Sequence, residues 1–136
     1  MINSIIKEII NKISGNGKLP VYSGFDTVSV ERKNRDFFTV IGLNSFELQT
    51  PVYSEFTIFV PYKADIDINI TAPESSPLQK LYEYFSDNIK PAVMEISGMN
   101  CSIRKISIKH DSNINRFVLT ARLSVSGIDR IERRSE

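Results

Sequence analysis

The isoleucines near the amino terminus constrain the fold more than any other feature of the sequence. They recur at steps of three and four residues, which places all of them on one stripe of a helix. The stripe consists of Ile2, Ile5, Ile6, Ile9, Ile10 and Ile13. Gly15-Asn16-Gly17 and then Pro20 predict that this helix ends near Ser14. We therefore expect an N-terminal helix that packs on a sheet.

The region after this helix is typical of β-strands. Alternating valines precede a polar run over residues 32–36, and a continuously apolar segment, 37–43, follows the run. This order predicts a hairpin with a charged tip, whose basic residues are Arg32, Lys33 and Arg35. Because hairpin tips on a rigid sheet often make contacts, this tip is either a solvated turn or a protruding interaction loop.

Two further strands are predicted between residues 52 and 70. Apolar residues lie on both faces of Val52–Tyr62, which is typical of a strand that is central in its sheet or covered on both sides, and Pro61 is expected to mark its end or an edge position. From Asp65 to Ile70 polar and apolar residues alternate strictly, which predicts a strand with one solvated face. Its isoleucines, including Ile66 and Ile68, are either core residues or an edge that pairs with a neighbouring subunit.

A second helix and a second hairpin complete the chain. Ser76-Pro77-Leu78-Gln79 has the form of a helix start with Ser76 as N-cap, and Pro91 is expected to close the helix. The isoleucine spacing around residues 103–108 indicates a strand with a bulge, and Phe117–Val125 alternates as a half-buried strand.

Single helices between runs of strands predict the α+β fold class. We expect a mixed or mainly antiparallel sheet, with the N-terminal helix and one central helix packed on it. A length of 136 residues suits a single domain over 1–136. Residues 1–127 are expected to form the folded core and residues 128–136 a charged C-terminal tail, frayed at the end of the chain.

Composition removes most classes of enzyme and several classes of partner. The chain has one cysteine, Cys101, and one histidine, His110, which excludes an intramolecular disulfide, a multi-cysteine zinc site and any site built on two imidazoles. Its formal net charge of +1 argues against a dedicated DNA-binding protein, so no sequence-specific nucleic acid is expected. No stretch approaches eighteen uncharged apolar residues, so no membrane partner is expected either.

A search for catalytic motifs leaves one conceivable pair. The sequence lacks a glycine-rich phosphate loop, a nucleophile elbow and a zinc-protease helix, and the acidic residues at 65 and 67 fit an alternating strand better than a calcium loop. Cys101 and His110 are nine residues apart, and either form a nucleophilic pair or are a buried thiol and a turn imidazole. We expect no catalytic residue, no cofactor and no metal site, and predict that the chain is not an enzyme.

The order of elements resembles a known family. The features that carry the resemblance are the Ile-rich N-terminal helix, the strand segments Asp36–Val40 and Phe56–Val60, the Ser-Pro-led helix over Leu78–Ile89 and the closing strand Phe117–Val125. In this layout the chain, from Met1 to about Gly127, resembles the tail-terminator (tail-completion) proteins of long-tailed phages and of phage-tail-like bacteriocins or injection particles.

The resemblance implies a structural assembly protein rather than an enzyme. Members form a ring, usually a homohexamer, that caps the head-proximal end of the tail tube and joins it to the neck; in contractile tails the ring also contacts the sheath. Implied partners are therefore the protein itself, the tube protein and the sheath and neck proteins, with no cofactor. The implied location is the bacterial cytoplasm during assembly and then a virion or phage-tail-like particle.

Two other classes of function remain open at this point. One is another assembly role, as a neck, baseplate or sheath-associated component, or as a small secretion chaperone or adaptor. The other is an enzyme or small-ligand binder that uses Cys101 and His110. For the assembly readings, the candidate interaction residues are Arg32, Lys33 and Arg35 in the charged tip and Ile66 and Ile68 in the alternating strand.

Overall fold

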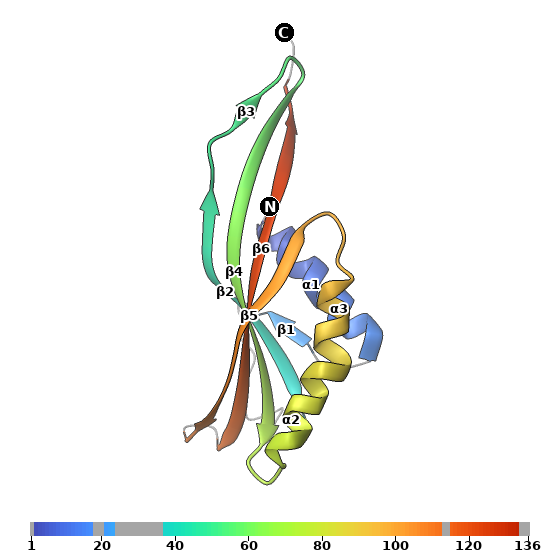
Figure 1. Ribbon diagram of the computed structural model, residues 1–136, viewed down its shortest axis with the longest axis vertical. Helices are drawn as coiled ribbons and strands as arrows, with labels where there is room; N and C mark the ends of the chain where they lie inside the picture. The colour runs from blue at the N-terminus through green and yellow to red at the C-terminus, as the bar shows by residue number, and fades with distance from the viewer. Residues whose placement is uncertain (1, 18–20, 24–36, 113–114, 134–136) are drawn as a thin grey trace.

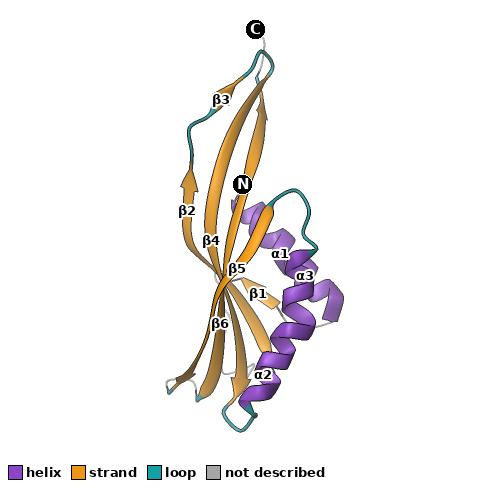
Figure 2. Ribbon diagram, in the orientation of Figure 1, coloured by secondary structure: helices purple, strands orange, loops and turns teal. Residues whose placement is uncertain are grey.

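The computed structural model describes residues 2–17, 21–23, 37–112 and 115–133. Figure 1 shows an elongated molecule in which one twisted sheet runs the full length and the helices cover one of its faces. The elements in chain order are α1 (Ile2–Gly17), β1 (Val21–Ser23), β2 (Phe38–Leu48), β3 (Val52–Tyr53), β4 (Thr57–Pro73), α2 (Leu78–Tyr84), the π-helical turn η2 (Phe85–Ile89), α3 (Lys90–Met94), β5 (Asn100–Asp111) and β6 (Arg116–Glu132). The predicted α+β class is confirmed (Figure 2).

The sheet has the strand order β1-β2-β4-β6-β5, and β3 pairs with β4 beside the end of β2. All of these pairings are antiparallel except that of β1 with β2, so the sheet is mainly antiparallel, as predicted. The longest pairing joins β4 to β6 over seventeen residue pairs, from Thr57↔Glu132 to Pro73↔Arg116. These two central strands therefore extend along the whole length of the molecule.

The core lies between the helices and the facing side of the sheet. The isoleucine stripe of α1 is buried as predicted at Ile5, Ile6, Ile9 and Ile13. The alternating residues of the two central strands that meet these helices are also buried: Ala64, Ile66, Ile68, Ile70 and Ala72 on β4, and Leu119, Ala121, Leu123 and Val125 on β6. The period-two patterns thus place the core face correctly.

The N-terminal helix is longer than predicted. It runs to Gly17 rather than ending near Ser14, because Gly15 does not have the positive φ that would turn the chain out of the helix.

The central strand β4 corrects the prediction of two separate strands. Pro61 lies within β4 and does not end it. Its carbonyl accepts a hydrogen bond of 2.9 Å from the amide of Gln49, just beyond the end of β2 at Leu48. In an antiparallel strand the N–H and the C=O of one residue point to the same side. The missing N–H of Pro61 is therefore on the side of Gln49, where β2 has already ended and no pairing partner is lost. The strand therefore continues through the proline.

The C-terminal segment is also more ordered than predicted. Residues 128–132 continue β6 and pair with residues 57–61 of β4, which corrects the prediction that the folded core ends at residue 127. Gly127 does not end the strand. It pairs with Tyr62 of β4, and the ring of that tyrosine lies over it.

The second helix corrects two predictions about its ends. Pro77, not Ser76, is the N-cap of α2, and no side chain caps that end. The helix also continues through Pro91 to Met94, because a π-helical turn precedes the proline. In that turn the amide of Lys90 donates to the carbonyl of Phe85, five residues back. This wider turn gives the proline ring the space that a regular α-helix would deny it.

The last hairpin agrees with its predicted pattern. The register of β5 against β6 shifts between Ile103 and Lys105, which confirms the bulge. The strand β5 runs on to Asp111, and Asn115 has a positive φ of 52° before β6 begins.

Candidate interaction surface

The structure separates the two residues of the conceivable nucleophilic pair. Cys101 and His110 lie near opposite ends of β5, nine residues apart along an extended strand, which corresponds to roughly 30 Å. They therefore cannot act on one substrate atom. The interpretation of these residues as a Cys-His pair is wrong.

The surroundings of each residue also fit a structural role. Burial raises the pKa of the half-buried Cys101 thiol, and the negative charge of Glu8 raises it further, which disfavours the thiolate. The exposed His110 lies 3.1 Å from a carboxylate oxygen of Glu74, and its ring stands edge-on to Phe117 at 5.2 Å between centroids. Among the described residues no three His, Cys, Asp or Glu side chains are grouped as a metal site would require.

The sheet face opposite the helices carries a ladder of polar side chains. Asp67 accepts hydrogen bonds from the Arg122 guanidinium at 3.0 and 3.4 Å, and the Thr120 hydroxyl donates to Asn69 at 2.7 Å. The hydrogen bond to Asp67, and then its negative charge, raise the pKa of Arg122. This face is therefore solvated and internally paired, as the alternation from Asp65 to Ile70 predicts.

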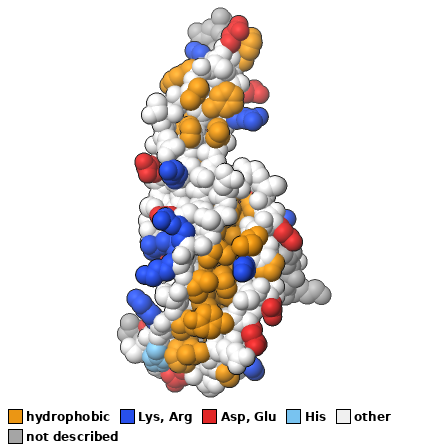
Figure 3. Space-filling model, in the orientation of Figure 1, with side chains coloured by type: hydrophobic (Ala, Val, Ile, Leu, Met, Phe, Trp, Pro, Cys, Tyr) orange, Lys and Arg blue, Asp and Glu red, His pale blue; other side chains and the backbone are white. Residues whose placement is uncertain are grey.

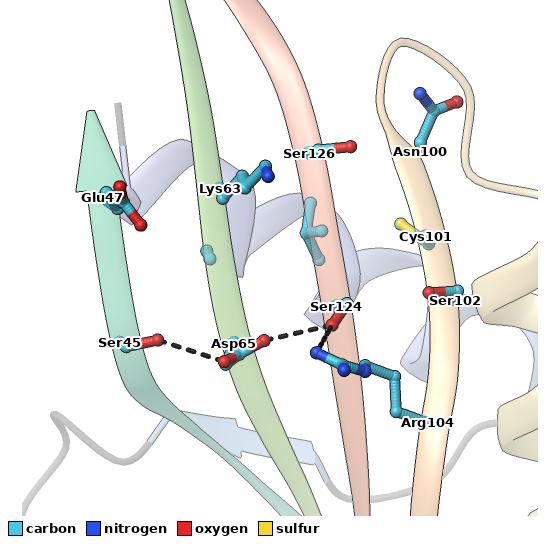
Figure 4. A pocket seen from close by; sticks show the side chains of 12 residues that line it. Ser45, Glu47, Lys63, Asp65, Asn100, Cys101, Ser102, Arg104, Ser124 and Ser126 are labelled. Atoms are coloured by element: carbon cyan, nitrogen blue, oxygen red, sulfur yellow. Dashed lines mark hydrogen bonds between the residues drawn. The ribbon is translucent and has the colours of Figure 1, made fainter. Parts of the chain in front are cut away.

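A shallow groove of about 420 Å³ crosses this polar face (Figure 4). At its centre Asp65 accepts hydrogen bonds from Ser45 at 3.3 Å and from Ser124 at 3.1 Å, and Arg104 donates to Ser124 at 3.4 Å. These four side chains come from four adjacent strands and bind one another. The groove is thus occupied by a cross-strand hydrogen-bond network.

The most distinctive surface is the end of the molecule where the sheet narrows. The pairing of β2 with β4 ends at Leu48↔Tyr62, and that of β5 with β6 ends at Asn100↔Ser126. Beyond these pairs, β3 is the one described strand that flanks β4 and β6, and these two strands project as a narrow ribbon (Figure 1). We call residues 48–61 and 127–133 the arm.

The tip of the arm is closed by its own hydrogen bonds. The Ser54 hydroxyl accepts a bond from the amide of Thr57 at 3.1 Å and donates to its carbonyl at 2.8 Å. The amide of Arg133 donates to the carbonyl of Phe56 at 2.8 Å, and its guanidinium donates to the carbonyl of Ser54 at 2.9 Å. These bonds hold the two ends of the ribbon together and give the tip a defined shape.

The arm exposes large apolar side chains that nothing in the described chain covers. Phe56 at the tip is 67% exposed. The other exposed apolar residues of the arm are Leu48, Val52, Tyr53, Ile128 and Ile131. Figure 3 shows these apolar side chains gathered at the narrow end, away from the helices. Such a concentration of apolar surface on a projecting element is typical of a site that binds another protein.

Cations lie over the aromatic rings of the arm. The Arg130 guanidinium is 5.7 Å from the ring centroid of Phe59, and that of Arg133 is 5.9 Å from the ring of Tyr53. Aromatic residues and arginine are the types enriched in protein interfaces. We therefore take the arm as the candidate interaction surface.

The two described candidates from the sequence, Ile66 and Ile68, do not lie on the arm. Arg32, Lys33 and Arg35 fall outside the described residues, so their role stays a prediction. Ile66 and Ile68 are fully buried, and β4 has a partner strand on each side, so the interpretation of these isoleucines as a pairing edge is corrected to core.

The sequence contained a signal for the arm, although it favoured a different interpretation. Residues 52–62 are apolar on both faces, and this pattern predicted a strand that is central in its sheet or covered on both sides. The strand is central in the sheet, but its first residues extend beyond the neighbouring strands and stay uncovered. Residues that pack a core and residues that bind a partner have the same apolar character, so the pattern alone does not separate them.

No protein-family model matches the chain, and no curated protein matches its sequence. Within the described residues no helix is long and apolar enough to cross a membrane.

Solved structures match the fold at low sequence identity. The sheath/tube terminator of an extracellular contractile injection system (PVC), determined by cryo-EM in the extended state, matches with a TM-score of 0.59 and 14% identity, over 99% of this chain and 57% of that one. This chain thus spans little more than half the length of that terminator.

Two further solved structures share less with the chain. One, whose name states no function, matches with a TM-score of 0.52 and 10% identity, over 98% of this chain and 94% of its own. The type 4 fimbrial biogenesis protein PilO from Pseudomonas aeruginosa reaches a TM-score of only 0.39 at 11% identity, over 94% of this chain and 69% of its own, and nothing is concluded from it. In its fold, the chain is similar to a sheath/tube terminator.

Proposed function

We propose that this protein is a structural tail terminator, which caps the head-proximal end of the tube in a phage tail or phage-tail-like particle. The observation that carries the proposal is that the fold match to a sheath/tube terminator, at a TM-score of 0.59, spans 99% of the chain. The element order read from the sequence resembles the same family. The arm then gives the molecule a surface for binding another protein.

The role that we propose is mechanical. Several copies close into a ring, of six by analogy with the family, and the ring ends tube growth because its free face does not bind a further tube subunit. A ring built from one chain needs heterologous contacts, in which two different surfaces of each copy meet. In this account the tube binds one face of the ring, and neck proteins, together with the sheath in a contractile particle, bind the other.

The proposal includes no catalytic step. Interfaces of this kind are stabilised by buried apolar side chains and hydrogen bonds, and the exposed residues of the arm are of those types. We accordingly propose a non-enzymatic protein without a cofactor, assembled in the bacterial cytoplasm into the particle. The charged residues Arg32, Lys33 and Arg35 are proposed to contribute to tube contact.

A tube-growth assay tests this function. Purified tube protein of the same particle is allowed to polymerise, and the chain is added at a few copies per tube. A terminator stops elongation at this substoichiometric amount and leaves tubes whose length is fixed by the time of addition. If elongation continues unchanged, or slows only in proportion to the chain added, the protein is not a terminator. Binding of a single client chain instead would identify a chaperone or adaptor.

A further inference from the structure

The strand β5 is the last strand on its side of the sheet. In the order β1-β2-β4-β6-β5 it pairs with β6, and no described strand lies on its other side. The backbone N–H and C=O groups on that side therefore face outward, as on any edge strand. An edge of twelve residues exceeds the usual length of a strand, so it can pair with a whole further strand. We call residues 100–111 the β5 edge.

Apolar side chains of the helical layer stay exposed beside this edge. They are Leu78, Tyr82 and Met94, and Ile106 of β5 itself is also exposed. Figure 3 shows a band of apolar side chains in this part of the molecule, with basic side chains along one of its sides. Because a helical layer buries its apolar residues against the strands beneath it, these residues mark a place where one strand is missing. We call the four residues the apolar margin.

A bulge in the β5 edge sorts apolar and basic residues onto its two faces. The register against β6 shifts between Ile103 and Lys105, so Arg104 is the extra residue of the bulge. The shift keeps Ile106 and Ile108 on the face that the helices cover, because they pair with core residues of β6. It also places Arg104 and Lys105 together on the polar face, although strict alternation would separate two consecutive residues.

The polar face of the β5 edge has an excess of positive charge. Its exposed cations, which form no ion pair within the described residues, are Arg104, Lys105 and Lys109. Asp67 lies in the same row of the sheet as Lys105, but it is bound by Arg122. The one acidic residue of β5, Asp111, is in register with Arg116 at the end of the strand. A strand added to this edge would therefore meet three cations on one face.

The acidic residues of the helical segment do not offset this excess. Glu83, Asp87 and Glu95 are exposed on the helices, together with Lys80 and Lys90. They belong to the layer that covers the opposite face of the sheet, toward which a further strand would turn apolar side chains. Charge therefore selects acidic residues for the polar face of that strand alone.

We propose that the β5 edge binds an extended segment of a partner protein in which acidic and apolar residues alternate. The segment adds one strand to the sheet through the outward N–H and C=O groups. Its acidic residues lie beside Arg104, Lys105 and Lys109, and its apolar residues cover the apolar margin. The inference goes beyond the terminator function and does not depend on it.

Within the described residues, the open edges of a second copy supply no such segment. Two β5 edges would place like charges opposite each other, which destabilises a pair of strands. The part of β2 beyond its pairing with β1, residues 42–48, carries one acidic residue, Glu47. The open end of β6 carries Asp129 and Glu132 on opposite faces, with Arg130 between them. Neither places several acidic residues on one face, so the occupant is a different protein.

A synthetic peptide of about ten residues that alternates glutamate and valine is the probe. Fluorescence anisotropy measures its binding to the purified full chain, and the affinity is expected to fall as salt is added. The same peptide with lysine in place of glutamate should not bind. No binding at millimolar peptide, or equal binding of both peptides, would overturn the inference. Binding of single-stranded DNA but not of the glutamate peptide would also overturn it, since the cations would then form a general polyanion surface.

A charge exchange locates the site. Arg104→Glu combined with Lys105→Glu, both at exposed positions, should weaken binding of the glutamate peptide by about tenfold or more and allow the lysine peptide to bind. Lys7→Glu combined with Lys12→Glu on α1 is the matched control, because it changes the net charge equally and should leave both affinities as they were. If the two double variants behave alike, the cations of β5 are not the site.

Methylated peptides test whether a strand is added. The N–H groups of alternate residues in a strand point to opposite sides, so methyl groups on the valine amides block one edge of the peptide and those on the glutamate amides block the other. One methylated peptide is expected to keep its binding and the other to lose it. Equal affinity of the two would overturn strand addition. No tube protein is present in these assays, so their outcome and that of tube capping are independent.

Discussion

Among the described glycines, Gly127 leaves the least space for an added side chain. A Cβ at this position would lie 2.5 Å from the hydroxyl oxygen of Tyr62 and 2.8 Å from the ring carbon that bears it. Tyr62 is itself buried and packs near Phe46, with 6.1 Å between ring centroids. The glycine therefore permits an aromatic ring to lie flat on the sheet where the arm begins.

Gly127→Ala is accordingly expected to destabilise the fold by about 2 kcal/mol, because the ring must move against packed neighbours. Urea unfolding measures the change in the free energy of unfolding. Gly42→Ala is the control, since it lies in the neighbouring part of the sheet and a Cβ there meets nothing within 4 Å. Equal free energies of unfolding for the two variants would contradict this packing.

The thiol of Cys101 provides a second test at this scale. Because burial and then the charge of Glu8 raise its pKa, less thiolate is present in the folded chain than in the unfolded chain at the same pH. At pH 8 a disulfide reagent is expected to modify the native protein more slowly than the protein in urea. A native thiol that reacts faster than the unfolded one would favour an enzyme that uses this residue.

Alkaline pH is expected to weaken the fold because it ionises buried and half-buried tyrosines. Burial is the first cause that raises the pKa of Tyr62 and of Tyr84 above the ordinary value of 10.0. The folded state therefore favours the neutral phenols: their contribution to stability is complete below pH 10 and is lost as pH rises through the folded pKa values. The urea midpoint should fall above pH 10, and fall less in Tyr84→Phe. An equal fall in Tyr84→Phe and in Tyr53→Phe, a change at an exposed position on the arm, would contradict this account.

At the scale of elements, the helix over residues 78–94 depends on its π-helical turn. Within this turn the side-chain amide of Asn88 donates to the carbonyl of Tyr84 at 3.3 Å. Pro91 then stands in the first turn of α3, where a missing amide costs little.

This arrangement predicts that proline is tolerated at position 91 of the helix and not at position 83. Pro91→Ala should change the free energy of unfolding by less than about 1 kcal/mol, because no helical hydrogen bond is lost at that site. Glu83→Pro, at an exposed position inside α2, should cost about 3 kcal/mol or more. Circular dichroism during urea unfolding compares the two variants, and a comparable loss in both would refute the role of the turn.

How far the sequence predicts these elements depends on the local signal. Alternation over Asp65–Ile70 and Phe117–Val125 correctly gave the solvated and buried faces, because burial on one side of a strand leaves a period of two. The local sequence predicts an end or an edge position at Pro61 and the end of the helix at Pro91, and neither element ends there. The contacts that accommodate them, the departure of β2 and the π-helical turn, depend on neighbours that the local sequence does not specify.

At the scale of the whole molecule, the sheet has one part that the helices cover and one part that extends beyond them. Where the helices cover it, apolar side chains form the core; where it extends beyond them, the same kinds of side chain face solvent on the arm. The sequence predicted the core of the first part and a central position for the strand over residues 52–62. It did not predict which residues of β4 and β6 remain uncovered, because that depends on where β2 and β5 end.

The arm should therefore matter for assembly and little for folding. Phe56→Ser and Ile131→Ser remove exposed apolar groups, so each is expected to change the free energy of unfolding by less than about 0.5 kcal/mol. The same variants should lose self-association and tube capping together. Gln49→Ser, a polar change within the arm that leaves its exposed apolar side chains in place, is the control. Variants that unfold, or folded variants that still cap tubes, would contradict the separation of folding from assembly.

The most direct test of the central claim is electron microscopy of tail tubes incubated with a tagged form of the chain. Negative staining shows where the label lies on each tube. The terminator account predicts a ring-shaped density at one end of each tube and at no other place. Label along the tube wall, at both ends equally, or absent from tubes altogether would contradict it.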